Sequence, residues 1–458
     1  MYAQDSIAAI ATPPGQGGIG IIRISGPLAQ RIATLLFVRS QVHDEWLSHH
    51  LYHGRIVDVD GRAIDEGLAV LMRAPRSFTG EDVLELHCHG SPVGLRRVLA
   101  CVLAAGARHA EPGEFTKRAF LNGRIDLTQA EAVVDMVRAC TPAGATLAAG
   151  QLSGQLSNYL TRVRERAIQL KALLEAEIDF SEEDFHVGVE EVLDTLAACA
   201  TPIETLLDSY RHGKILRDGA RVVIIGKPNV GKSSLLNALL GEERAIVTPI
   251  AGTTRDSIDE PVDFDGLPVV LSDTAGLRDV AAAETVERIG MQRTAERIAE
   301  AQLLLSVLDA STPLDALDEM VLQEHASAAR IIVLNKIDLP RVLLEVDVRR
   351  VSNGHPVVPV SAERHTGLAE LRRVVLEQLG TTAFPRETPV LTNLRHVDAL
   401  RKAHTSLSCA RESIVSRQPA DLVAVDVQDA IDHISTVTGA ITSDEILDRI
   451  FSEFCIGK

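Results

Sequence analysis

The sequence is poor in aromatic residues, which make up 3% of its 458 positions, although hydrophobic residues make up 46%. We therefore expect alanine- and leucine-rich helices to supply much of the core. The length is enough for about three domains of ordinary size. The formal net charge of −17 excludes binding of nucleic acid through bulk electrostatics, so any RNA contact must be a local patch.

Paired cysteines, a leader segment and long apolar runs are also missing. No Cys-x-x-Cys pair occurs, which argues against a disulfide framework and fits a reducing cytosol. The N-terminus has no basic segment followed by an apolar one, and no apolar run is long enough to span a bilayer. We therefore expect a cytoplasmic protein with no membrane partner. The cysteines are scattered at Cys88, Cys101, Cys140, Cys199, Cys409 and Cys455.

A phosphate-binding motif lies near the middle of the chain. The sequence Gly-Lys-Pro-Asn-Val-Gly-Lys-Ser at residues 226–233 directly follows the apolar run 222–225. In such a P-loop, backbone N–H groups surround phosphate oxygens. Lys232 is expected to reach the β- and γ-phosphates, and the Ser233 hydroxyl to bind Mg²⁺. The motif alone indicates only a nucleotide hydrolase.

Four further motifs follow in the order expected of a GTPase. Residues 252–256 (Gly-Thr-Thr-Arg-Asp) supply a threonine for the Mg²⁺ shell, and residues 273–276 (Asp-Thr-Ala-Gly) contact Mg²⁺ and the γ-phosphate. Residues 335–338 (Asn-Lys-Ile-Asp) let Asp338 accept hydrogen bonds from guanine, and residues 360–362 (Val-Ser-Ala) offer an N–H to its O6 atom. Five ordered motifs indicate an active GTPase rather than an inactive α/β domain.

The catalytic glutamine of Ras-type enzymes is absent, because Leu277 follows the Asp-Thr-Ala-Gly motif. Leucine cannot orient a water molecule, so that task must fall elsewhere. The carbonyl of the Asn229 side chain is a candidate ligand for a monovalent cation beside the phosphates. Glu287 is a candidate for orienting water, although a lone glutamate of this kind is more often a solvated surface acid.

The pattern of the chain predicts a multidomain α/β protein. Residues 1–118 predict an α+β domain with strands at 6–11, 19–25, 67–72 and 83–87 and a helix at 92–105. Residues 119–215 are helical, with an apolar stripe from Leu152 to Leu174. Residues 216–380 predict an inserted Ras-like P-loop domain. Residues 381–458 return to helices, the last one starting at a capping box formed by Thr442 and Glu445, with Ile446, Ile450 and Phe454 on its apolar stripe. The helices on either side of the insertion are expected to form one discontinuous bundle.

The chain closely resembles the MnmE (TrmE) family of GTPases that modify uridine 34 of tRNA, over essentially its whole length. Beyond the GTPase motifs, the resemblance rests on residues 11–15 with 20–25, on 78–85, 112–122 and 286–290, and on the terminal Phe-Cys-Ile-Gly-Lys at 454–458. It implies a homodimer whose N-terminal domain binds 5,10-methylene- or 5-formyl-tetrahydrofolate and whose G domains hydrolyse GTP on K⁺-dependent dimerisation. It also implies a flavoprotein partner, MnmG (GidA), in a heterotetramer that adds a carboxymethylaminomethyl or aminomethyl group to the tRNA.

The resemblance also assigns site residues. The folate site would be lined by Arg23, Glu85, Arg124 and Lys458. Mg²⁺ would be bound by Ser233 and Thr254, and K⁺ by Asn229, Thr248, Ile250 and Thr253, the middle two through backbone carbonyls. The catalytic group would consist of Glu287, Thr254, Lys232 and Cys455. Other nucleotide-binding positions are Val230, Gly231, Ser234, Asp273, Thr274, Ala275, Gly276, Asn335, Lys336, Asp338, Ser361 and Ala362.

Several alternatives stay open from the sequence. Arg23 and Arg124 are also compatible with surface ion pairs, and Cys455 with a packed small side chain. His87 and His89 share one strand face, as metal ligands would, but no further ligand spacing accompanies them. A ribosome-assembly or RNA-binding GTPase shares the P-loop sequence, yet would carry a basic RNA module. A folate enzyme that uses GTP only for regulation is a third possibility.

Overall fold

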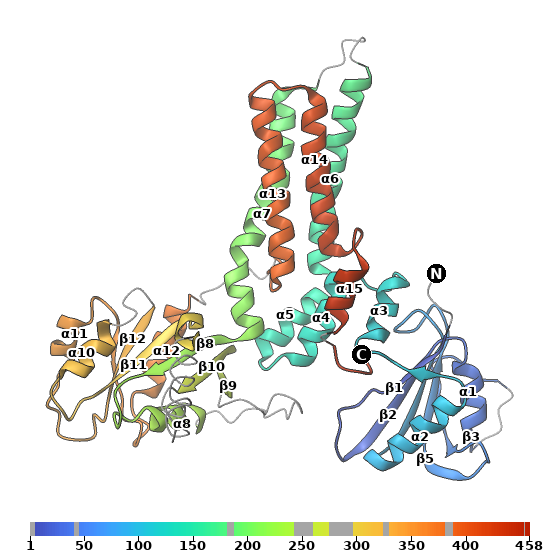
Figure 1. The fold of residues 1–458 in the computed structure, drawn as a ribbon, viewed down its shortest axis with the longest axis horizontal. Coiled ribbons are helices and arrows are strands. Elements are labelled where there is room, and N and C mark those ends of the chain that lie inside the picture. The colour runs from blue at the N-terminus through green and yellow to red at the C-terminus, as the bar shows by residue number, and fades with distance from the viewer. Residues whose placement is uncertain are drawn as a thin grey trace, which may run out of the picture. The chain divides into compact units, whose positions relative to one another are not determined.

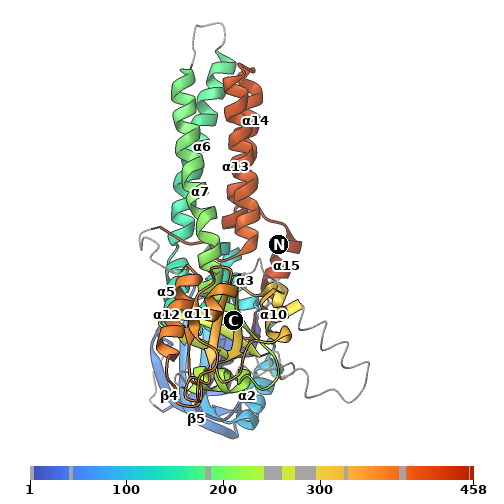
Figure 2. The same cartoon turned by 90° about the vertical axis from the view of Figure 1, so that its left-hand side faces the viewer.

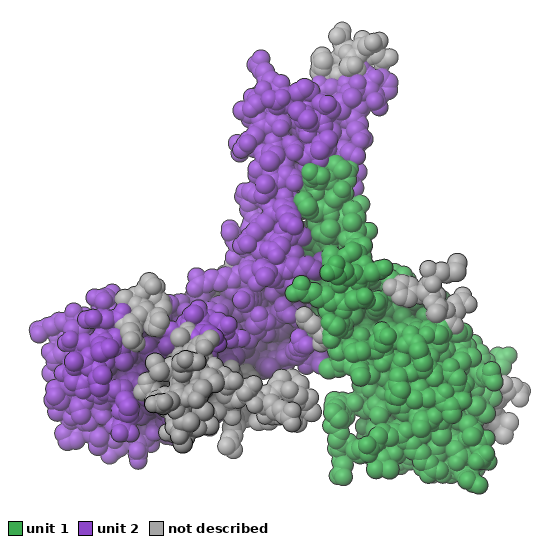
Figure 3. All heavy atoms as spheres, viewed as in Figure 1, with its two compact units in different colours: residues 1–134, 152–164, 428–458 green, residues 135–151, 165–427 purple. Residues whose placement is uncertain are grey.

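The computed structural model describes residues 5–40, 45–180, 187–241, 260–273, 296–323, 329–380, 388–452 and 454–458, without the side chains of residues 260, 261 and 273. It divides into two compact units (Figures 1 and 3). Unit 1 comprises residues 1–134, 152–164 and 428–458, and unit 2 comprises residues 135–151 and 165–427. This division does not test the boundaries at residues 118, 215 and 380, which stay predictions.

Unit 1 contains a mixed sheet. Its strands are β1 (Ile7–Ile10), β2 (Gly17–Ser25), β3 (Phe37–Arg39), β4 (Leu51–Val57), β5 (Ala63–Met72), β6 (Val83–Gly90) and β7 (Arg108–His109). Among the described residues they pair in the order β3-β4-β5-β6-β2-β1-β7, antiparallel except for β1 with β7. The four predicted strands are present, whereas β3, β4 and β7 had not been predicted.

Alternation along the central strands gives the sheet two different faces. Ile22, Ile24, Leu84 and Leu86 are fully buried and pack against helices α1 (Ala29–Leu36) and α2 (Pro92–Ala104). Because successive side chains of a strand point to opposite faces, Arg23 and Glu85 lie on the other face, and they are paired in the β2–β6 register. The core thus places two of the predicted folate residues side by side.

Unit 1 also contains helices that come before and after the G domain in the sequence. They are α3 (Glu114–Leu121), α4 (Leu127–Arg138), α6 (Gln155–Asp179), α14 (Ala420–Thr438) and α15 (Asp444–Ser452), of which α4, α6 and α14 run on into unit 2. Arg164 Nε on α6 donates a hydrogen bond to Ser435 Oγ on α14 at 2.9 Å. Helices from before and after the insertion therefore pack together, as the discontinuous bundle requires.

Two helix predictions need correction. Leu152 belongs to α5 (Pro142–Leu152) rather than α6, because Gly154 adopts a left-handed φ of +85° between them. The last helix is capped by Ser443, whose Oγ accepts from Ile446 N at 3.4 Å, and not by Thr442. It consequently buries Leu447 and Phe451, with Phe454 just beyond its end, and leaves Ile446 exposed.

Unit 2 contains the G domain and the helices that lead into and out of it. Helices α7 (Val189–Asp218) and α13 (Leu394–Val415) run side by side (Figures 1 and 2), and His404 pairs with Glu204 across them at 2.8 Å. Helix α7 buries Val192, Leu196, Cys199, Ile203 and Leu206 on one stripe. Apolar packing of this stripe explains why the segment is helical despite Pro202 in its interior.

The G-domain sheet is built from β8 (Ala220–Ile225), β9 (Glu260–Phe264), β10 (Leu267–Asp273), β11 (Leu303–Asp309), β12 (Arg330–Asn335) and β13 (Val357–Pro359). In the described part of the chain their order is β13-β12-β11-β8-β10-β9, parallel except for β9. The helices are α8 (Lys232–Gly241), α10 (Ala316–Gln323), α11 (Glu345–Val351) and α12 (Leu368–Gln378). The near-continuous apolar strands are typical of a sheet covered on both faces.

Candidate functional site

The P-loop connects the carboxyl end of β8 with the start of α8. Gly226 has a φ of +155°, and a Cβ at this position would lie 2.6 Å from Val307 O. Gly231 has a φ of +94°, and a Cβ there would collide with the Asn335 side chain. Both positions therefore require glycine for steric as well as conformational reasons. Helix α8 begins at Lys232, so its N-terminus and the loop's N–H groups form an anion site.

The lysine and the hydroxyls predicted to contact phosphate and Mg²⁺ lie at this helix start. Lys232 is buried, with 7% of its surface exposed, and its Nζ donates a hydrogen bond to Lys227 O at 2.9 Å. Ser233 and Ser234 follow it and are exposed. A buried ammonium at a helix N-terminus, followed by an exposed hydroxyl, fits a Mg²⁺-bound triphosphate.

The residues predicted to bind guanine are brought together from three loops. Asn335 Nδ2 donates to Val230 O at 2.9 Å, and Asn335 Oδ1 accepts from Ala362 N at 3.1 Å. Ser361 Oγ donates to Asp338 Oδ1 at 2.6 Å, and this bond lowers the pKa of the Asp338 carboxyl. Asp338 is therefore an ionised acceptor at neutral pH, as recognition of guanine N–H groups requires.

Lys336 links the guanine side to the P-loop. Its Nζ donates to Asn229 O at 2.7 Å and pairs with Asp309 Oδ2 at 2.6 Å. Burial raises the pKa of Asp309, but hydrogen bonds from Lys336 and Ser311 outweigh it and hold that pKa below its usual value. Asp309 was not among the predicted site residues, although its position as the last residue of a buried apolar strand indicated one.

Several predicted site residues lie outside the described residues, so their positions stay predictions. They include the switch and K⁺ positions and the candidate water-orienting glutamate. Asp273 ends β10 at the edge where the P-loop begins, but its side chain is not described. The residues concerned are Thr248, Ile250, Thr253, Thr254, Thr274, Ala275, Gly276 and Glu287.

A second site lies on the face of the unit 1 sheet opposite α1 and α2, where the C-terminal tail meets the predicted folate residues. Arg23 Nε donates to Glu85 Oε1 at 2.8 Å, and Arg23 Nη1 donates to Gly457 O at 3.4 Å. His87 Nε2 lies 3.3 Å from Glu85 Oε2. The hydrogen bond with His87 lowers the pKa of Glu85, and Arg23 lowers it further against the opposing effect of burial. Glu85 is thus an oriented, ionised acceptor.

The tail is fixed by main-chain contacts. Ile456 forms an antiparallel bridge with Pro112, Gly113 N donates to Cys455 O at 3.5 Å, and Lys458 N donates to Cys455 O at 3.3 Å. The Cys455 side chain is exposed. Burial lowers the pKa of the Lys458 amine, and the charge of Arg23 lowers it further. The thiol and the amine are therefore held near Arg23 and Glu85 rather than left on a free chain end.

Arg124 lies beside this group rather than within it. Its Nε donates to Ser77 O at 3.1 Å, and the neighbouring Phe78 ring lies 5.8 Å from the Arg23 guanidinium. In the described part of the chain, Arg124 forms no hydrogen bond with Arg23, Glu85 or Lys458. The tail and its partners consequently form the centre of the site, and Arg124 lies at its margin, against the 77–80 loop.

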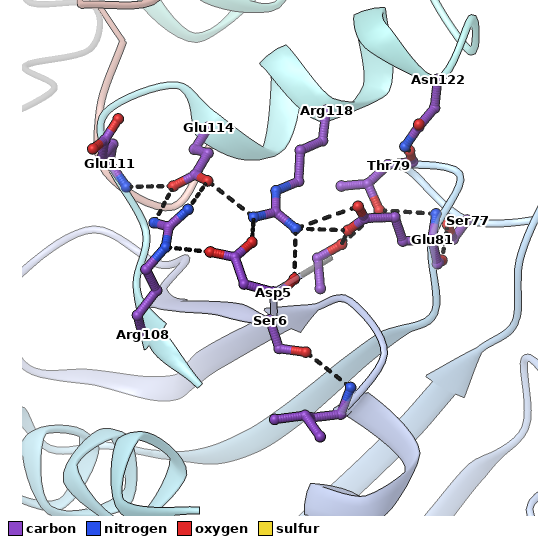
Figure 4. A network of polar contacts seen from close by, with 12 residues as sticks. Asp5, Ser6, Ser77, Thr79, Glu81, Arg108, Glu111, Glu114, Arg118 and Asn122 are labelled. Carbon is purple, nitrogen blue, oxygen red and sulfur yellow. Dashed lines mark hydrogen bonds and ion pairs between the residues drawn. The ribbon is translucent and has the colours of Figure 1, made fainter. Parts of the chain in front are cut away.

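Helix α3 supports the tail, and an ion-pair network fixes the helix (Figure 4). Arg118 pairs with Asp5, Glu81 and Glu114 at 2.6, 3.2 and 3.0 Å. Arg108 joins the same network through Glu114 Oε1 at 2.6 Å. Lys117, which precedes Arg118 in the helix, pairs with Asp448 of α15 at 2.7 Å. These contacts account for the charged residues of the segment 112–122, which are Glu114, Lys117 and Arg118.

Replacing Arg118 with methionine is expected to destabilise unit 1 by about 3 kcal/mol, because carboxylates facing it lose their common cation. Trp46 is the only tryptophan and is buried in the unit 1 core, so its fluorescence during urea unfolding reports on this unit. Lys117→Met is the matched control: its partner Asp448 is 69% exposed, and the loss should stay below about 1 kcal/mol. Equal stability of the two variants would contradict the role of the network.

All six cysteines lie within the described residues, and none of them forms a disulfide. No helix within the described residues is both long and apolar enough to cross a membrane. Among those residues there is also no cluster of histidine, cysteine and acidic side chains suited to a metal ion. His87 and His89 instead pair with Glu85 and Asp65 at 3.3 and 2.7 Å.

Comparison with known proteins shows the family of the chain. A family model described as the N-terminus of the GTP-binding protein TrmE matches residues 6–124, and one described as the MnmE helical domain matches residues 127–455. Proteins named tRNA modification GTPase MnmE match from end to end. That of Geobacter sulfurreducens is 47% identical, with 100% of both chains covered. That of Symbiobacterium thermophilum is 48% identical, with 99% of this chain and 100% of the relative covered.

Proposed function

Since this chain belongs to the MnmE family of tRNA modification GTPases, we propose that it is a K⁺-dependent GTPase that modifies C5 of uridine 34 in tRNA with a one-carbon unit from tetrahydrofolate. The observation that carries the proposal is the docking of the tail, with Cys455 and Lys458, beside the Arg23–Glu85 pair. A GTP site in one unit and a nucleophile-bearing site in the other suit hydrolysis coupled to a second reaction.

At the GTP site, residues of this chain would bind GTP, orient the attacking water and compensate the charge of the phosphates. Lys232 would contact the β- and γ-phosphates, and Ser233 with Thr254 would hold Mg²⁺, which when bound would offset the negative charge of the phosphates. Asp338 would select guanine, and the Ala362 N–H would contribute by exchanging its bond with Asn335 Oδ1 for one with guanine O6. K⁺ would be held by Asn229, Thr248, Ile250 and Thr253, and Glu287 would orient the attacking water.

The dependence on K⁺ gives a prediction about Asn229. Hydrolysis should be at least about tenfold faster in K⁺ than in Na⁺, equivalent to about 1.4 kcal/mol of transition-state stabilisation. Asn229 has a φ of +65°, so Asn229→Ala combines loss of the amide with backbone strain. Asn229→Gly removes the amide without that strain. Both variants should lose the K⁺ effect and retain GTP binding; equal wild-type rates in the two salts would rule the mechanism out.

At the tail site, the residues present fit a reduced folate. Arg23 and Lys458 are cations suited to its carboxylates, and the ionised Glu85 can accept hydrogen bonds from pterin N–H groups. The folate, when bound, supplies the one-carbon unit. The exposed Cys455 thiol is the nucleophile of the tail, and its closeness to Lys458 lets an amine hold or release a proton beside it.

We further propose that the working form is a cytoplasmic homodimer, joined by the flavoprotein MnmG in a heterotetramer that acts on tRNA. The sequence motifs shared with the family support this assembly. The acidic net charge of −17 means that tRNA must be bound through a local basic patch or through the partner.

Nucleoside analysis of tRNA tests the proposal. A deletion strain should lack the C5 substituent at uridine 34, and the wild-type gene should restore it. Cys455→Ser should fail to restore it while keeping K⁺-stimulated GTP hydrolysis. Deleting residues 455–458 should in addition weaken binding of 5-formyl-tetrahydrofolate in titration calorimetry. Normal folate binding and full modification by the truncated protein would refute the assignment of the second reaction to the tail.

A further inference from the structure

Lys227, the second residue of the P-loop, is anchored at both its side chain and its main chain. The P-loop pattern leaves this position open. Its side chain is nevertheless only 16% exposed, and its Nζ pairs with Asp315 Oδ2 at 2.9 Å and with Asp318 Oδ2 at 2.8 Å. Burial lowers the pKa of Lys227, but the bonds with Asp318 and Asp315 outweigh it and raise that pKa overall. The ammonium is therefore a permanent cation here.

The two carboxylates that receive Lys227 are fixed at the start of α10. Asp315 Oδ1 accepts from Leu317 N and Asp318 N, both at 3.0 Å, and Asp318 Oδ2 accepts from Asp315 N at 3.3 Å. This reciprocal arrangement is a capping box, which orients both side chains rigidly. Asp318 is a buried residue, with 3% of its surface exposed. Its Oδ1 atom has no hydrogen-bond partner among the described residues. Lys227 is therefore the cation that pairs with this buried carboxylate.

The main chain of Lys227 holds the catalytic lysine. Lys227 O is the acceptor for Lys232 Nζ at 2.9 Å, and Lys232 is the residue predicted to reach the β- and γ-phosphates. Gly226, one residue earlier, lies close to Val307, since a Cβ at position 226 would be 2.6 Å from Val307 O. The side chain of Lys227 therefore fixes, through its own peptide, the position of the Lys232 ammonium.

We propose that Lys227 is a positioning residue for GTP hydrolysis, which acts by anchoring the Lys232 acceptor to the Asp315–Asp318 capping box of α10. The proposal depends on the GTPase activity of the family and on contacts within unit 2, and not on the tRNA chemistry. It also gives α10 a function: displacement of its first turn would be transmitted to the phosphate site through one side chain.

The test must separate positioning from stability. Lys227→Met alone leaves the Asp318 carboxylate buried without its cation, which destabilises the fold by itself. The double variant Lys227→Met/Asp318→Asn removes that unpaired charge as well as the anchor. Lys227→Arg keeps a cation that can bridge both carboxylates. Glu319→Gln, an exposed acid on the same helical turn, is the matched control.

We expect the single Met variant and the double variant both to lose about 10- to 100-fold in kcat at saturating GTP, the loss caused by small displacements of catalytic groups. The double variant should recover the melting temperature that Lys227→Met loses, measured by circular dichroism. Lys227→Arg should keep most of the turnover, and Glu319→Gln all of it. Recovery of kcat together with stability in the double variant, or wild-type kcat in Lys227→Met, would overturn the proposal.

Discussion

Replacing Glu287 with alanine is expected to lower the rate of GTP hydrolysis at least about hundredfold, the usual contribution of a positioned acid or base. The reason is the leucine at position 277, which has no group able to orient water where Ras-type enzymes use glutamine. Single-turnover hydrolysis in K⁺ measures the effect. Affinity for GTP should change little, because guanine and phosphates are bound by the P-loop and by residues 335–338 and 360–362.

Glu296→Ala is the control for this measurement, since Glu296 is an exposed glutamate further along the same segment. It should hydrolyse GTP at the wild-type rate. A Glu287→Ala variant that matched this control would make Glu287 a solvated surface acid and leave the task of orienting water to another group.

Replacing Gly457 with alanine is expected to reduce tRNA modification at least about tenfold while leaving GTP hydrolysis unchanged. Gly457 has a φ of +96°, which side-chain-bearing residues rarely adopt, and a Cβ there would lie 2.5 Å from Ile10 O. The tail must move to relieve this contact. It would then lose the hydrogen bond from Arg23 to Gly457 O, and Cys455 and Lys458 would leave the neighbourhood of Glu85. A misplacement of about an ångström can cost a hundredfold in rate.

Nucleoside analysis of tRNA from complemented deletion strains measures this loss, and purified protein gives the GTPase rate in parallel. Ile456→Ala is the matched control, because the Ile456 side chain is 58% exposed and its bridge with Pro112 uses only the main chain. Full modification by Gly457→Ala would mean that the docked tail position is not the one in which the chemistry occurs.

The sequence by itself determined the nucleotide site, the family and much of the fold class. Its five GTPase motifs are short, and each carries its chemistry in a few neighbouring residues, such as Lys232 and Ser233 in the P-loop. Apolar runs before Gly226, Asp273 and Asn335 also identified the parallel strands, because buried strands are read from local composition. Such features need no knowledge of which distant segments meet.

Only the tertiary structure decided which residues support those motifs. Helix α3 is held by the ion pairs of Arg118 with Asp5 and Glu81, which lie far from it in the sequence. The C-terminal tail also contacts Arg23, which is separated from it by nearly the whole length of the chain. Lys227 and Asp318 likewise come together only because β8 and β11 are neighbours in the sheet. The capping of α15 by Ser443 depended on which face packs against α4. Ion pairs and side-chain packing between distant segments leave no periodic or local signal in a single sequence, whereas phosphate binding by consecutive residues does.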